Sequence, residues 1–199
     1  MKKLLCIVAP ILAAAPMFAG TLTQGERDQA IAELTASRQA FLDSVAGLSA
    51  AQWNFKPDEK TWSVFECAEH IALSEDLIFG NIARIMQGPP NPDKTDAVTD
   101  EFILKAVVNR TQKFQAPPPL QPKHTFATPQ ELLDHFKASR EKTIAYVRDT
   151  QDDLRSHHFD HPVLKTMDGY QWVLLLSAHS QRHTAQLNEV KANPNFPKE

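Results

Sequence analysis

Cysteine is almost absent from this chain. Only Cys6 and Cys67 occur among its 199 residues, and Cys6 lies in an N-terminal segment that we expect to be removed. A single remaining cysteine excludes an intrachain disulfide and any CxxC redox or metal motif. The fold must therefore be held by its hydrophobic core, to which a bound metal ion could add stability.

The chain also lacks a large excess of positive or negative charge, and glycine is scarce. The chain has 21 Lys and Arg against 24 Asp and Glu, for a formal net charge of −3, and it has no basic stripe. Nucleic-acid binding therefore has no electrostatic basis. With six glycines and no alternating runs of Val, Ile and Thr, the sequence also lacks the pattern of a β protein. We expect an all-α fold.

Residues 1–19 have the layout of a secretory signal peptide. A basic start precedes an uncharged apolar run over residues 4–18, and Ala19 offers a small residue for cleavage. The run is too short and too interrupted by proline to span a membrane, which takes about 20 apolar residues. We expect export to the periplasm or beyond, no stable membrane insertion after the signal is removed, and one mature domain over residues 20–199. The alternative is an N-terminal helix that packs on the body of the protein.

Cap motifs and apolar spacing predict four long helices. Each begins after a capping residue that has Glu or Gln three positions later: Thr23, Ser63, Thr128 and Asp168. The first helix is expected to end near residue 48, the second near residue 87 and the last near residue 193.

The connections between these helices differ in length. A shorter helix over residues 100–114 and a proline-rich segment over residues 115–129 separate the second long helix from the third. Residues 157–169, before the last helix, are expected to form a loop. Four amphipathic helices with one long crossover between the second and the third indicate a four-helix bundle.

Two histidines interrupt the apolar stripe of the last helix. His179 and His183 share a face with Leu175, Leu176 and Val190. Side chains at i and i+4 are neighbours on a helix, about 5–6 Å apart at Cβ, so two imidazoles so spaced can point at one ion. The spacing is that of the HExxH zinc helix, but no glutamate follows His179, so that protease chemistry is not indicated.

A third ligand should come from another helix, and His70 on the second helix is the best candidate. It lies in a stripe with Glu66, Leu73 and Leu77, beside the main apolar face. The other histidines fit less well. His124 is expected in the crossover and His135 on a solvated face, and the loop before the last helix holds three histidines that are either surface residues or line the mouth of the site: His157, His158 and His161.

Two stretches resemble the motifs of the DinB-like superfamily. WSVFECAEHIALSE (residues 62–75) matches the family pattern W-S-x-x-E-x-x-x-H-[IL], and HSQRHTAQL (residues 179–187) matches H-x-x-x-H-x-x-Q-[IL]. LTASRQAFLDSVAGLSAAQWNFKP resembles the family's first helix and the turn that follows it. The resemblance covers roughly residues 26–192, nearly all of the mature chain.

The resemblance implies one divalent metal ion bound by His70, His179 and His183, with coordination positions left open. Imidazole ligands suit zinc, nickel, iron or copper, and zinc or nickel is expected first. The family includes metal-dependent hydrolases, thiol S-transferases, a maleylpyruvate isomerase and members without an assigned activity. Because such bundles often pair, a homodimer is a further expectation.

Three neighbours of the predicted site have two interpretations each. Glu66 is either a general base or only the third residue of the Ser63 capping box. Gln186 either orients His183 or is solvated. Cys67 is either a small core residue or a fourth ligand.

Arginine and tryptophan positions also bear on the site. Arg38 and Arg140 interrupt apolar stripes, so they bind an anionic substrate, pair with an acidic side chain, or extend their charged ends to solvent. Trp62 and Trp172, each near a helix start, are expected in the core. No catalytic residue is assigned.

Two classes of function remain open. The first is a metal-dependent enzyme, foremost a hydrolase that acts through metal-bound water on an unknown small molecule, with thiol-dependent S-transfer as the alternative. The second is a non-catalytic bundle that binds a metal or another ligand. Export favours hydrolysis over S-transfer, because low-molecular-weight thiols are cytosolic pools and hydrolysis needs only water.

Overall fold

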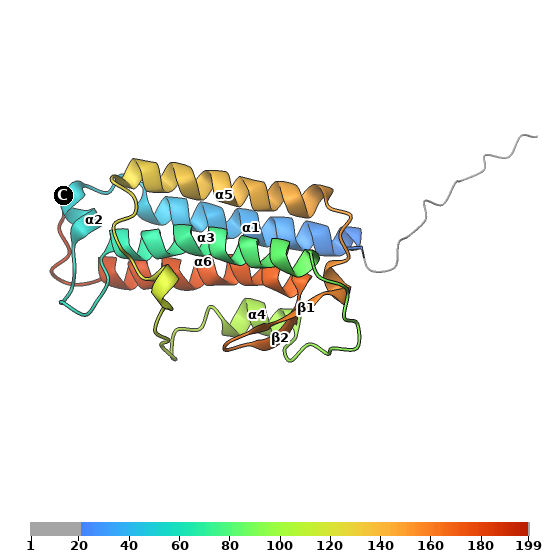
Figure 1. Cartoon of the computed structure of the whole chain (residues 1–199). Helices are drawn as coiled ribbons and strands as arrows, with labels where there is room; N and C mark the ends of the chain where they lie inside the picture. The colour runs from blue at the N-terminus through green and yellow to red at the C-terminus, as the bar shows by residue number, and fades with distance from the viewer. Residues whose placement is uncertain (1–20, 199) are drawn as a thin grey trace, which may run out of the picture.

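Four long helices lie side by side and form the body of the protein (Figure 1). The computed structural model describes residues 21–198, so the expected signal peptide lies outside the described residues. The four helices are α1 (Gln24–Val45), α3 (Val64–Met86), α5 (Pro129–Asp149) and α6 (Gly169–Lys191). The predicted all-α bundle is therefore confirmed. Within the described part of the chain, none of the helices has the length and apolar character needed to cross a membrane.

Each long helix begins where its capping residue predicts. Thr23 and Ser63 form reciprocal capping boxes with Glu26 and Glu66 at the starts of α1 and α3. Thr128 caps α5 and Asp168 caps α6, each by accepting a backbone N–H three residues later; α5 also has proline at its first position. Such a cap contributes about 1 kcal/mol, because it satisfies an otherwise unpaired donor at the helix end.

The crossover between α3 and α5 holds two short elements, α4 (Asp100–Ala106) and the 3₁₀ turn η1 (Pro118–Leu120). The predicted helix over residues 100–114 was wrong in its second half. Arg182 of α6 donates to the carbonyl oxygens of Val107, Asn109 and Gln112. These carbonyls are bound by a side chain from another helix, and the segment follows an irregular course.

A second correction concerns the predicted loop over residues 157–169. It contains an antiparallel hairpin of β1 (His158–His161) and β2 (Lys165–Asp168), with His158 opposite Asp168. The hairpin lies beside α4 on one face of the bundle (Figure 1). The 3₁₀ turn η2 (Leu154–Ser156) leads into it, and the short helix α2 (Ala50–Asn54) follows α1.

The bundle core contains a buried ion pair. Arg140 of α5 is fully buried and binds the carboxylate of Glu75 on α3, with Nε 2.8 Å from Oε2. Its remaining donors reach the Leu34 carbonyl, the Ser37 hydroxyl and the Ser180 hydroxyl, so one guanidinium joins all four helices. Of the interpretations of Arg140, the acid partner is the correct one.

Arg38 has an acid partner as well, but on the surface. Its Nη1 lies 2.9 Å from Oε2 of Glu141, which is 60% exposed. An exposed pair of this kind contributes little to stability.

Candidate metal centre

Helices α3 and α6 bring three histidines together. One ring nitrogen from each of His70, His179 and His183 lies within 4.8 Å of the others, the one such group of three or more potential ligands found within residues 21–198. The ring centroid of His70 lies 5.0 Å from that of His179 and 4.2 Å from that of His183. The helical i, i+4 spacing places the two α6 rings with their centroids 4.4 Å apart and their planes tilted by 47°, and the packing of α3 on α6 supplies the third ring.

Hydrogen bonds define the tautomers of two of these rings. Nδ1 of His70 lies 2.7 Å from the carbonyl oxygen of Leu120, and Nδ1 of His183 lies 2.8 Å from Oε1 of Gln186. Oε1 of Gln186 also accepts from Arg110, which fixes the orientation of its amide. Because both partners are acceptors and a neutral imidazole has one N–H, each ring carries its proton on Nδ1.

The two Nε2 atoms are therefore without protons, yet they face each other 3.2 Å apart. Two lone pairs at this distance repel unless a cation lies between them. Nitrogen ligands of a tetrahedral zinc ion, each at about 2.0–2.1 Å, stand about 3.3 Å from one another. The separation of His70 and His183 fits a shared metal ion.

Burial keeps these rings neutral, as metal ligands must be. It lowers the pKa of His70, which is 2% exposed. The pKa values of His179 and His183 lie well below their usual range, first because of burial and then because of the neighbouring histidines and Arg182. A second proton on any of the three is thus disfavoured, and the ring nitrogens remain free to bind a metal.

Side chains outside the histidine group hold it in position. Gln186 receives a hydrogen bond from Arg110, whose Nε lies 2.7 Å from Oε1 of Glu189. Gln186 therefore orients His183, and the solvated interpretation is wrong. The indole of Trp62 packs at 5.1 Å against the ring of His70, half-buried rather than in the core, whereas Trp172 is fully in the core. The sequence contained no signal for the roles of Arg110 and of the Leu120 carbonyl, because neither belongs to a motif.

Glu66 has its carboxylate oxygens engaged away from the histidines. One accepts the backbone N–H of Ser63 at 2.8 Å and the other accepts from Lys56 at 3.0 Å. The capping interpretation accounts for the first contact, and the second is an ion pair with Lys56. Cys67 is fully buried, and burial raises the pKa of its thiol to about 12. A thiol that stays protonated behaves as a core residue, as the first interpretation had it.

The five remaining histidines lie outside the group. His161 is close enough to lower the pKa of His179, and its Nδ1 accepts the backbone N–H groups of Val163 and Leu164. The other four have partners elsewhere: His157 with Asp153, His158 with Asn91, His135 with Asp76, and His124 with Phe65. Of the hairpin histidines, His161 is therefore the one associated with the candidate site.

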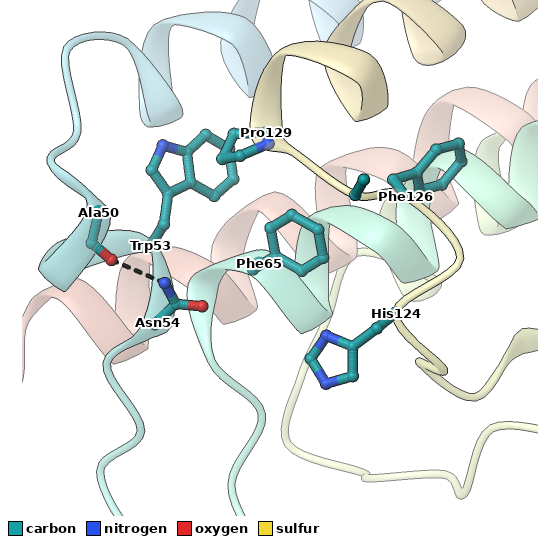
Figure 2. Close-up of a pocket in the computed structure, with 8 residues that line it drawn as sticks. Ala50, Trp53, Asn54, Phe65, His124, Phe126 and Pro129 are labelled. Atoms are coloured by element: carbon teal, nitrogen blue, oxygen red, sulfur yellow. Dashed lines mark hydrogen bonds between the residues drawn. The ribbon is translucent and has the colours of Figure 1, made fainter.

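A separate pocket lies at the end of the bundle near α2 (Figure 2). Its volume is about 270 Å³, and its lining is mainly apolar and aromatic: Ala50, Trp53, Asn54, Phe65, His124, Phe126, Ala127 and Pro129. The rings of His124 and Phe65 stack there with an interplanar angle of 18°. None of the three clustered histidines lines it.

A helix bundle with a long crossover and three histidines from its second and last long helices defines a recognisable class of protein. The chain belongs to the DinB superfamily, whose family model matches residues 33–187. A curated relative, the uncharacterized protein YuaE of Bacillus subtilis (strain 168), is 24% identical over 149 residues, which is 75% of this chain and 89% of YuaE.

A solved structure shows the same fold. It is described as YfiT from Bacillus subtilis, a probable metal-dependent hydrolase with an unusual four-helix bundle topology. The two chains superpose with a TM-score of 0.56 at 16% identity, over 90% of this chain and 93% of that one. At this identity the likeness establishes the fold alone.

Proposed function

We propose that this protein is a metal-dependent hydrolase with a mononuclear site formed by His70, His179 and His183. The observation that carries the proposal is the pair of unprotonated Nε2 atoms of His70 and His183, 3.2 Å apart in a site where burial opposes protonation. The description of YfiT as a probable metal-dependent hydrolase supports the same class of activity. Zinc or nickel is the proposed ion, because neutral imidazoles suit both.

His70, His179 and His183 would hold a divalent ion, which would supply a Lewis acid and would lower the pKa of a water molecule. Other residues of the chain orient the histidine rings. Leu120 and Gln186 keep the protons of His70 and His183 on Nδ1, so that both Nε2 atoms face inward. Trp62 shields one side of His70 from water, which strengthens electrostatic interactions in the site.

Export and a small-molecule substrate belong to the same proposal. A protein outside the cytosol has water in excess and little access to thiol cofactors, which favours hydrolysis over S-transfer. An N-terminal sequence of the native protein that begins near residue 20 would support export, and an intact Met1 in the cytosol would restore the S-transferase alternative.

The test is an activity screen with defined metal content. Protein loaded with zinc or nickel, metal-free protein and the His183→Ala variant are assayed on ester, amide, phosphoester and thiol-conjugation panels. The control is His135→Ala, which removes an exposed histidine bound to Asp76. We expect hydrolysis by metal-loaded wild type and H135A, and none by metal-free protein or H183A.

Three outcomes would contradict the proposal. Turnover that requires an added thiol would establish the S-transferase. Ligand binding by the metal-loaded protein without turnover of any substrate would establish a non-catalytic binder. Hydrolysis that survives metal removal would assign the activity to another site.

A further inference from the structure

Glu69, the residue before His70, has an unusual set of partners. Its side chain is on α3, is fully buried, and accepts three consecutive backbone N–H groups of the crossover. Lys123 N and Thr125 N lie 3.2 Å and 2.7 Å from Oε1, and His124 N lies 3.2 Å from Oε2. A buried carboxylate requires hydrogen-bond donors, and here these donors come from the crossover itself.

The same crossover supplies the partner of His70. The carbonyl oxygen of Leu120 accepts the Nδ1–H of His70 at 2.7 Å. Two adjacent residues of α3 thus bind the crossover at two points, at Leu120 and at residues 123–125. The contact to His70 bears on the candidate metal site, and the contact to Glu69 fixes the chain next to it.

The chain between these two points has little freedom. Pro119 and Pro122 restrict the backbone on both sides of Leu120, and the 3₁₀ turn adds a hydrogen bond from the Leu120 N–H to the Pro117 carbonyl at 2.9 Å. His124 has a φ of 55°, in the left-handed region. In this conformation successive N–H groups can converge on one acceptor group, and here they converge on the carboxylate of Glu69.

We infer that Glu69 is a positioning residue for the metal site: it fastens residues 123–125 so that the Leu120 carbonyl holds His70 in the tautomer that can bind a metal. Without this fastening the Leu120 carbonyl moves away from Nδ1. The ring of His70 can then carry its proton on Nε2, and a protonated Nε2 cannot be a ligand. The inference rests on the proposed three-histidine metal site.

The test compares Glu69→Gln with wild type in the full mature chain. Glutamine keeps the size of the side chain, but its NH₂ group meets N–H donors where the carboxylate accepted them. The matched control is Glu131→Gln, because Glu131 also accepts a crossover N–H, that of Ala127 at 2.9 Å, outside the 123–125 turn. Both variants are examined without metal and with zinc.

Two readouts are used. The first is the histidine tautomer in metal-free protein, read from nitrogen-15 NMR of labelled imidazoles. We expect the Nδ1 tautomer of His70 to predominate to the same extent in wild type and E131Q, and the Nε2 tautomer to gain population in E69Q. The second is zinc affinity, by competition with a chromophoric chelator, where loss of such an indirect contact weakens binding about 10- to 100-fold.

A merely structural role for Glu69 would lower the melting temperature of E69Q and leave both the tautomer and the zinc affinity as in wild type, which would overturn the inference. Wild type that binds neither zinc nor nickel would instead overturn the proposed function, and the tautomer readout would still be interpretable. If E69Q does not fold, Glu69→Asp is read in the same way. Its carboxylate is one methylene short of the turn, so we expect an intermediate effect, and an unchanged tautomer would contradict the inference.

Discussion

Replacement of Arg140 by methionine should destabilise the bundle strongly. The substitution leaves the carboxylate of Glu75, which is 1% exposed, without its counter-charge, and it removes the donors to Leu34 and Ser37. Breaking a buried ion pair from one side costs about 3–5 kcal/mol, because the remaining charge is left desolvated and unpaired. That is a large part of the 5–15 kcal/mol by which a typical domain is stable.

The double variant Arg140→Met with Glu75→Leu separates this cost from the loss of packing. With both charges gone, no buried ion remains, and replacement of a buried pair by apolar residues is often neutral. We expect the double variant to lie within about 2 kcal/mol of wild type, since it loses only the hydrogen bonds to the Leu34 carbonyl and to the Ser37 and Ser180 hydroxyls.

Urea unfolding at pH 7 measures both variants, with circular dichroism as the probe. The exposed pair of Arg38 and Glu141 offers the control, because Arg38→Met should change the free energy of unfolding by less than about 1 kcal/mol. A single variant R140M as stable as R38M, or a double variant less stable than R140M, would refute the reasoning.

Two further predictions concern the site and its support. Gln186→Leu removes the acceptor of the His183 Nδ1–H and should weaken zinc binding about 10-fold or more. Gln186→Glu keeps an acceptor beside Arg110 and should bind zinc at least as tightly as wild type. Zinc affinities are measured by chelator competition, and equal affinities of the two variants would contradict the role of Gln186. Burial raises the pKa of Asp168 from 3.8 to about 6 in spite of Arg155. The folded state therefore holds this proton more tightly than the unfolded state, and the stabilisation is present below about pH 4 and lost as the pH rises through 6. In the Asp168→Asn variant the side chain cannot ionise but still caps α6. The free energy of unfolding of this variant, relative to that of wild type, should therefore increase between pH 4 and pH 7. The increase is at most about 3 kcal/mol, because each unit of pKa shift corresponds to about 1.4 kcal/mol. A relative value that stays constant in urea titrations across that range would contradict the assignment.

The helix starts and the bundle were predictable because they depend on local signals. The capping partners of Thr23 and Ser63 lie only three residues further along the chain, and apolar spacing identifies the buried face of each helix. The three histidines were predictable because two of them share one helix face and the third occurs in a matching motif. Their convergence in the structure agrees with that prediction, and their role as ligands remains to be measured.

The features that were missed depend on contacts between distant parts of the chain. The helix over residues 100–114 ends early where Arg182 binds its carbonyls, and the four-residue strands of the hairpin are too short to show a pattern. The contact of Leu120 with His70 involves a backbone carbonyl, which every residue has. No side-chain pattern can identify such a partner.

The most direct test of the metal site is the metal content of protein purified without chelators, measured by inductively coupled plasma mass spectrometry. The account predicts close to one divalent ion per chain in wild type and in the control His135→Ala. It predicts almost none in the double variant His179→Ala with His183→Ala, provided that circular dichroism shows the same helix content. Unchanged metal content in the double variant, or none in wild type after incubation with zinc and nickel, would contradict the account.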